Sequence, residues 1–178
     1  PEDSTLYKKH YVFPDSISIN FPEQKRNLIV IWMESMETNY QDSVHGGNLQ
    51  ANLIPEITAL SARNLNFTPG GESVAGTDWT MGAQVAKLCG LPLILPWGEK
   101  DVSNIPGFVP KAICLTDILA KQGYSLTYIQ GSDAKFSSKR EFWEQHGKIQ
   151  IHDINYYKQQ KRLPNNYQVF WGFEDFKL

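Results

Sequence analysis

A continuous apolar run, Leu28-Ile29-Val30-Ile31-Trp32-Met33, is the feature that most constrains how this chain can fold. The run is rich in β-branched residues, follows the charged pair Lys25-Arg26 and ends at Glu34. Strands that are buried on both faces of a parallel sheet have this composition, because helices cover them from both sides. The run therefore predicts a buried parallel strand, and with it an α/β fold.

Periodicity along the rest of the chain predicts further helices and strands. Helical spacing or helix-stop glycines mark residues 55–63, 77–89, 114–122 and 137–146, and short β-rich segments lie at 64–67, 124–130 and 148–154. This order predicts a mostly parallel sheet with helices on both faces. Residues 1–25 read as a leader segment that packs on the surface of a domain over residues 26–178, and residues 91–111 read as a long loop.

Composition excludes several classes of protein. The 178 residues are 41% hydrophobic and 20% charged, which is typical of a globular domain. The net charge of −2 gives no basic footprint for nucleic acid. The longest apolar runs fall far short of the roughly 20 residues that a membrane span needs. With two cysteines, the chain is neither a disulfide-dense miniprotein nor a cysteine-based zinc protein.

Two positions suggest where chemistry takes place. Glu34 follows the strongest predicted strand, and ligands of open α/β sheets gather at the carboxyl ends of strands. Thr77 lies where the predicted helix over 77–89 begins, and the N–H groups of a helix N-terminus favour a phosphate. A hydroxyl there can become a nucleophile when a divalent metal activates it. The competing interpretations are a solvated loop acid and an ordinary helix N-cap.

Four blocks of sequence, in order, carry a resemblance to a known family. They are Asn27–Glu37 (NLIVIWMESME), Gly76–Pro92 (GTDWTMGAQVAKLCGLP), Cys114–Tyr124 (CLTDILAKQGY) and Trp171–Asp175 (WGFED). Together they resemble the sulfatase-like phosphoglycerol transferases of the alkaline phosphatase superfamily. The nearest likeness is to members that act on periplasmic glucans, and lipoteichoic acid synthases and phosphoethanolamine transferases are more distant.

The resemblance implies a role for individual residues. Glu34 matches an acidic metal ligand at a strand end, and Thr77 matches a threonine that is both metal ligand and covalent phospho-acceptor. Thr80 is the rival nucleophile, because it is also a hydroxyl at the helix start. Lys139 falls near a basic residue that holds the substrate phosphate, and Trp79 would wall the glycerol pocket; their competing interpretations are a solvated helix lysine and a packing residue. The implied metal is Mn²⁺ or Zn²⁺, with Mg²⁺ as a third option.

The chain also departs from the family pattern. The family completes its metal site with an Asp-His pair and a further histidine, and this sequence has no Asp-His dipeptide. His146 and His152 are interpreted as structural. Because zinc needs three or four protein ligands, we expect this chain to be the amino-terminal part of a catalytic domain. The remaining ligands and a membrane anchor would then lie outside it, and the chain alone would bind metal poorly and be inactive.

Cys89 and Cys114 flank the Pro/Gly-rich loop, at the end of one predicted helix and the start of the next. A disulfide between them would stabilise the fold by about 3.5 kcal/mol in the chain-entropy model, and an oxidising periplasm would permit it. Two buried free thiols are the alternative.

The function implied by the resemblance is transfer of phosphoglycerol from a phosphatidylglycerol-type lipid to a glycan acceptor, at the periplasmic face of the bacterial inner membrane. A phosphoethanolamine transferase is one alternative. A sulfatase is disfavoured because residues 76–82 lack a Cys/Ser-x-Pro/Ala-x-Arg context. A binding or sensor domain with a degenerate metal site is the alternative of another class. An incomplete sheet also predicts exposed apolar surface or self-association.

Overall fold

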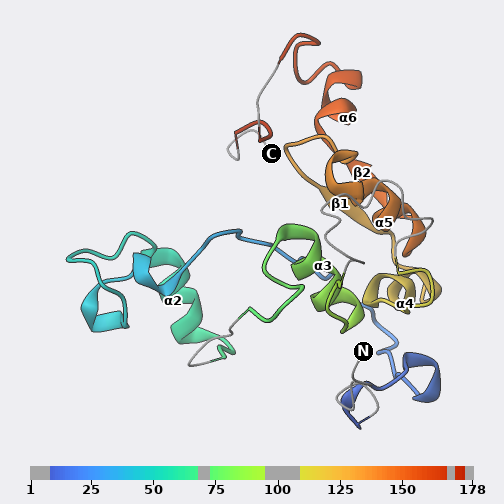
Figure 1. The fold of residues 1–178 in the computed structure, drawn as a ribbon, viewed down its shortest axis with the longest axis horizontal. Coiled ribbons are helices and arrows are strands. Elements are labelled where there is room, and N and C mark those ends of the chain that lie inside the picture. Colours follow the sequence, from blue (N-terminus) through green and yellow to red (C-terminus); the bar gives the residue numbers. More distant parts are fainter. Residues whose placement is uncertain (1–8, 68–72, 95–108, 168–170, 175–178) are drawn as a thin grey trace. The chain divides into compact units, whose positions relative to one another are not determined.

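The structure is a computed structural model that describes residues 9–67, 73–94, 109–167 and 171–174 (Figure 1). The chain divides into two compact units. The larger contains residues 1–19 and 74–178, and the smaller contains residues 20–73. Each unit is described by itself below. None of the described helices is long and apolar enough to span a membrane.

Short helices dominate the larger unit, and two strands lie between them. After the 3-10 helix η1 (Pro14–Ser16), the elements are α3 (Thr80–Cys89), α4 (Leu115–Lys121), β1 (Thr127–Ile129), η4 (Phe136–Ser138), α5 (Lys139–Gln145), β2 (Gln150–His152) and α6 (Ile154–Gln159). Both α6 and η4 lie where the sequence pattern does not predict a separate helix.

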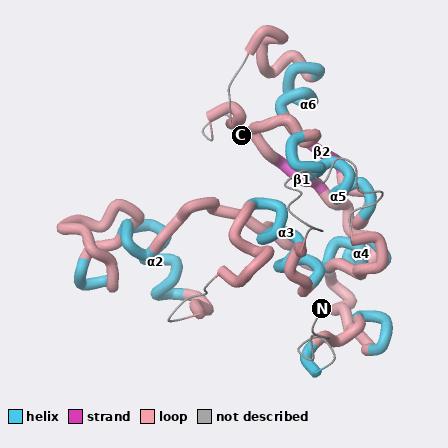
Figure 2. The backbone as a smooth tube through the Cα atoms, viewed as in Figure 1, coloured by secondary structure: helices cyan, strands magenta, loops and turns pink. Residues whose placement is uncertain are grey.

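The sheet has two parallel strands among the described residues, as Figure 2 shows in magenta. Tyr128 of β1 is in register with Ile151 of β2. Helix α5 connects the strands, and its Trp143 stacks on Tyr128 with ring centroids 4.3 Å apart. The predicted α/β character and parallel pairing are therefore confirmed on a small scale, whereas the larger sheet is not present in the described residues.

Residues 28–33 are the main departure from the predicted fold. The structure assigns no strand there, and Ile29 and Ile31 are 82% and 75% exposed. The strand predicted at 64–67 is also absent, with Leu65 87% exposed. A strand exists only when a neighbour pairs with its N–H and C=O groups, and among the described residues neither segment is part of a sheet. The predictions are wrong here because an apolar sequence indicates that a segment tends to be buried, but it does not show that a neighbouring strand is available to pair with it.

The smaller unit has helices but no apolar core among its described residues. Its elements are η2 (Thr38–Tyr40), η3 (Ser43–His45) and α2 (Pro55–Arg63). Helix α2 has the bounds that the sequence predicts, because Pro55 pre-sets the first helical φ angle. It contains no buried residue. Polar contacts hold its start instead: the Thr58 hydroxyl accepts from the side-chain amides of Gln41 and Asn52, at 2.8 and 2.9 Å.

The other predicted helices are shorter in the structure than in the sequence analysis. Helix α3 begins at Thr80, three residues after the predicted start, whereas its end at Cys89 with Gly90 in the left-handed conformation is confirmed. Helix α4 lacks only the terminal residues of its predicted range. Helix α5 begins at Lys139 because Ser137 and Ser138 have positive φ angles of 56° and 54°, which a continuous helix does not allow.

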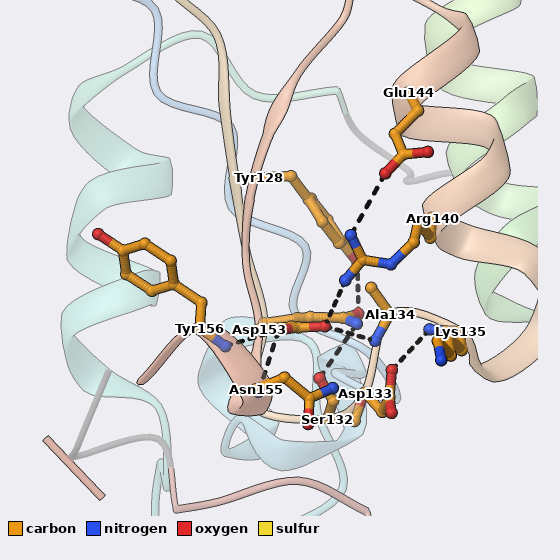
Figure 3. Close-up of polar contacts among 11 residues, drawn as sticks. Tyr128, Ser132, Asp133, Ala134, Lys135, Arg140, Glu144, Asp153, Asn155 and Tyr156 are labelled. Carbon is orange, nitrogen blue, oxygen red and sulfur yellow. Dashed lines mark hydrogen bonds and ion pairs between the residues drawn. The ribbon is translucent and has the colours of Figure 1, made fainter. Parts of the chain in front are cut away.

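A buried carboxylate organises the carboxyl end of the sheet (Figure 3). Asp153, 1% exposed, follows β2 and accepts hydrogen bonds from the backbone N–H groups of Asn155 and Tyr156, which caps α6. Its other oxygen accepts from Ala134 N at 3.1 Å and pairs with Arg140 at 3.0 Å. The side chain thereby joins the loop after β1, helix α5 and helix α6.

The block Trp171–Phe173 packs against the same loop. Phe173 N donates to Gly131 O at 3.0 Å, and Phe173 is buried against Tyr157 of α6. Gly172 has a φ of +121°, and a Cβ on Gly131 would lie 2.8 Å from Phe173 O. This close approach of two backbones explains why both positions are glycine. Asp175, the last residue of that block, lies outside the described residues.

Candidate functional site

Thr77 lies in a turn before α3 and is half-buried. Its hydroxyl donates to Val74 O at 2.8 Å and accepts from Val74 N at 3.0 Å. The preceding Gly76 has a φ of +80°, and its carbonyl accepts from Leu93 N at 3.1 Å. The predicted interpretation of Thr77 as the residue that opens the helix is therefore corrected: a local turn holds the hydroxyl three residues before the first helical residue.

Thr80, and not Thr77, occupies the helix start at which the sequence analysis expects a hydroxyl. Thr80 is the first residue of the helix and is half-buried, and Trp79 occupies the N-cap position without a side-chain cap among the described residues. A Cβ on Gly82 would lie 2.7 Å from the Trp79 indole nitrogen. The Trp79 ring thus lies back against the first turn of its own helix, as the packing interpretation expects.

Glu34 lies in the smaller unit, in a turn that follows the apolar segment 28–33. The side chain is exposed, and the next residue, Ser35, has a positive φ of 58°. The predicted position of Glu34 at the carboxyl end of a strand is therefore wrong, because the structure assigns no strand to residues 28–33. Thr77 belongs to the larger unit, so a shared metal between Glu34 and Thr77 stays a prediction.

Lys139 is buried, with 7% of its surface exposed. It is the first residue of α5, directly after the two residues with positive φ, and its Nζ lies 5.3 Å from the centre of the Phe136 ring. This burial contradicts the interpretation of Lys139 as an ordinary solvated helix lysine. The amino group at the end of this long side chain lies beside an aromatic face instead of in open water.

Cys89 and Cys114 form a disulfide that links the end of α3 to the N-cap of α4. Both side chains are buried. Of the 24 residues between the two cysteines, residues 95–108 lie outside the described part of the chain. The predicted long loop over 91–111 is therefore described only at its ends.

An acid and a histidine lie beside this disulfide. Asp117 Oδ2 accepts from Cys114 N at 2.9 Å and contacts His146 Nδ1 at 2.9 Å. His146 is 2% exposed and lies at the C-cap of α5, the helix end that the sequence predicts for it. One potential ligand atom from each of Cys114, Asp117 and His146 lies within 4.8 Å of the others. This group could hold a metal, but a disulfide sulfur is not the thiolate that metals prefer.

Sequence reasoning missed this group and the Arg140–Asp153 pair. Cys114 and Asp117 form a capping box in the structure, but cysteine replaces the usual Ser or Thr, so the sequence pattern of capping boxes does not reveal it. The contact from Asp117 to His146 spans 29 residues and leaves no sequence signal. The same is true of Arg140 and Asp153, which adjoin only because β2 follows α5.

Comparison with known proteins gives the family relationship. The chain is 37% identical over 157 residues to "Phosphoglycerol transferase I" of Xanthomonas campestris pv. campestris (strain B100), covering 86% of this chain and 21% of that protein. The chain is homologous to phosphoglycerol transferase I. The enzyme of the same name from Escherichia coli O6:K15:H31 is 34% identical over 158 residues, which is 89% of this chain and 20% of that protein.

These findings confirm the resemblance to phosphoglycerol transferases that the four sequence blocks carry. The chain spans about a fifth of the length of the curated relatives it matches. No protein-family model and no solved structure matches the chain.

Proposed function

We propose that this chain is part of an enzyme that transfers phosphoglycerol from a phosphatidylglycerol-type lipid to a glycan acceptor. The observation that carries the proposal is the 34–37% identity, over more than four fifths of the chain, to proteins named phosphoglycerol transferase I. We place the reaction at the periplasmic face of the bacterial inner membrane. The activity belongs to a longer protein, and the 178-residue chain alone is inactive.

Glu34 and Thr77 are the residues that we propose as ligands of a divalent metal. A carboxylate and a hydroxyl are hard oxygen donors, which suit Mn²⁺ or Mg²⁺ and are also found around Zn²⁺. The two hydrogen bonds of the Thr77 hydroxyl are both to Val74, in a half-exposed turn, so the oxygen can exchange them for a ligand. Two donors are fewer than such an ion needs, and further ligands complete the site.

Thr77 is the proposed nucleophile, and Thr80 is the alternative. Its oxygen attacks the phosphorus of the lipid headgroup, the bond to diacylglycerol breaks, and diacylglycerol leaves as the alcohol with the proton that the threonine loses. A bound divalent ion would supply Lewis-acid stabilisation of the threonine oxygen. An acceptor hydroxyl then takes the phosphoglycerol group and restores the threonine.

Two features of the larger unit support binding of a phosphate. The side chain at the N-cap of α3, Trp79, makes no capping hydrogen bond, and the N–H groups of the first turn lie at the positive end of the helix dipole. Lys139 offers a buried cation. We propose that these groups hold the non-bridging oxygens of the transferred phosphate while the charge on them rises.

A donor assay on the full-length protein tests this function. Membrane vesicles carry either phosphatidylglycerol labelled in its headgroup glycerol or phosphatidylethanolamine labelled in its ethanolamine, and soluble glucan oligosaccharides are the acceptor. We expect label on the oligosaccharide from phosphatidylglycerol only. Transfer from phosphatidylethanolamine, or from neither lipid, would contradict the proposal.

The proposed role of Glu34 has a matched control three residues further along the chain. Glu34→Gln should lower the transfer rate by at least about 100-fold, because the variant loses a charged ligand. Glu37→Gln, whose exposed carboxylate contacts the Asn39 amide, should leave the rate within about twofold. Equal rates for the two variants would remove Glu34 from the metal site.

A further inference from the structure

We propose that reduction of the Cys89–Cys114 disulfide opens a zinc site formed by the two cysteines, Asp117 and His146. The inference is independent of the proposed transferase function and of the metal at Glu34. It rests on the position of four potential ligands around one disulfide, in the larger unit.

Three helix ends bring the four side chains together. Cys89 ends α3, Cys114 is the N-cap of α4 with Asp117 in its first turn, and His146 follows α5. The ligand atoms of Cys114, Asp117 and His146 lie within 4.8 Å of one another, and Cys89 is bonded to Cys114. Side chains this close can surround one ion after small rotations about their side-chain bonds.

The ligand set suits zinc. Two thiolates, one imidazole nitrogen and one carboxylate oxygen give the four ligands of a tetrahedral site, and zinc accepts all three kinds. Cys89, Cys114 and His146 are at most 4% exposed, whereas the Asp117 side chain is 21% exposed and leaves a route for the ion. The two cysteines do not exclude a zinc site when an acid and a histidine supply the other ligands.

Because the two cysteines are buried, their thiolates need a compensating positive charge after reduction. A thiolate that forms where the cysteines lie would be an uncompensated buried charge, which is costly. A divalent ion balances two thiolates, so that the metal favours their ionised form and the ligand protons are released on binding. The hydrogen bond from Cys114 N to Asp117 also fixes the carboxylate beside the sulfur before any metal arrives.

The redox step needs a dithiol reductant. Its two thiols donate two electrons and two protons to the Cys89–Cys114 bond and become a disulfide themselves, while the protein gains two thiols. In the oxidised chain the two sulfur atoms are bonded to each other, so neither is available as a thiolate ligand. The covalent link between α3 and α4 is thus exchanged for a metal-mediated one. An oxidising compartment favours the disulfide form. Zinc binds only to a chain whose cysteines have not yet been oxidised or have been reduced again.

The test compares zinc binding by the oxidised and the reduced 178-residue chain. Both forms are titrated with zinc against a chromophoric chelator, after the reductant has been removed without air. We expect one zinc per reduced chain, with an affinity at least about 100-fold above that of the oxidised chain. Cobalt, which substitutes for zinc, should give a thiolate-to-metal charge-transfer band in the reduced chain only.

A second acid–histidine pair in the chain provides the matched controls. His45 Nδ1 lies 2.7 Å from Asp42 in the smaller unit, where no cysteine occurs. Asp117→Asn and His146→Gln should each lower the zinc affinity of the reduced chain at least about tenfold, since even outer-shell partners are worth 10–100-fold. Asp42→Asn and His45→Gln should not change it.

Circular dichroism of each variant separates loss of a ligand from loss of the fold. Cys89→Ser/Cys114→Ser should fold without binding zinc under either condition. If His146→Gln unfolds because its side chain is buried, the Asp117→Asn variant and the cobalt spectrum of the unaltered chain still test whether the zinc site forms. Equal zinc affinity in the oxidised and reduced chains, or a reduced-chain affinity that survives Asp117→Asn, would overturn the proposal.

Discussion

Asp42 and His45 form a surface contact that changes the pKa of the Asp42 carboxyl. Asp42 Oδ1 accepts from His45 N at 3.0 Å and lies 2.7 Å from His45 Nδ1. The hydrogen bond from the His45 side chain lowers the pKa of Asp42 below its usual value, with backbone hydrogen bonds adding to the effect. A carboxylate whose pKa is lowered by folding stabilises the fold above its unfolded pKa, about 3.9, and loses this contribution as pH falls through the folded pKa.

This effect can be measured by NMR titration of the Asp42 carboxyl carbon. We expect a midpoint below the usual value for aspartate in the chain as it is, and a rise toward that value in His45→Gln. A midpoint that does not move when His45 is replaced would show that the contact is absent in solution.

At the level of residues, the sequence identifies side chains that are able to do chemistry, but it does not predict what surrounds them. It singled out Thr77, but not the turn that ties its hydroxyl to Val74. For Lys139 it offered either a phosphate ligand or a solvated lysine, and burial removes the second option. Asp117 and His146 come into contact only when α4 and α5 pack together, so no local sequence pattern predicts this pair.

Helix α6 and the loop after β1 depend on one buried carboxylate. Asp153 accepts four hydrogen bonds, one of them charge-assisted from Arg140. Asp153→Ala removes the α6 cap and leaves Arg140 and the Ala134 N–H without this partner. We expect the free energy of unfolding, measured by urea denaturation of the 178-residue chain, to fall by about 3 kcal/mol.

Arg140 also provides the control for that experiment. Its second partner, Glu144, lies 3.3 Å away with a side chain that is 58% exposed. Solvent screens such a pair, so Glu144→Ala should cost below about 1 kcal/mol. Equal losses for Asp153→Ala and Glu144→Ala would show that burial of Asp153 does not decide the stability of this region.

At the level of elements, locally determined features were predictable and paired ones were not. Pro55 and the left-handed Gly90 fix an end of α2 and of α3 from within the sequence, and those ends agree with the structure. The predicted start of α3 and the predicted strands at 28–33 and 64–67 disagree with the structure. Whether a β-rich segment becomes a strand depends on a distant hydrogen-bonding neighbour, which periodicity cannot supply.

The described part of the chain carries many exposed apolar side chains. In the smaller unit, Ile29, Ile31, Leu65 and Phe67 are between 75% and 87% exposed. Exposed apolar segments are sites of association. We therefore expect sedimentation velocity to show concentration-dependent self-association of the 178-residue chain.

Substitution of the apolar segment checks the cause. Ile29→Ser/Ile31→Ser should shift the chain toward monomer, because it removes apolar area from the segment where a strand is missing. Val44→Ser, at a position that is 87% exposed but lies outside that segment, should leave the association unchanged. A chain that is monomeric at all concentrations, or equal association in the two variants, would contradict this interpretation.

We propose above that a longer protein transfers phosphoglycerol through a covalent threonine. Mass mapping of peptides from the full-length protein, quenched during turnover with phosphatidylglycerol and no acceptor, tests the claim most directly. We predict a phosphoglycerol adduct on Thr77 that persists in Thr80→Val and disappears in Thr77→Val. An adduct on Thr80 would transfer the nucleophile to the first residue of α3, and an active enzyme without an adduct on either threonine would contradict the account.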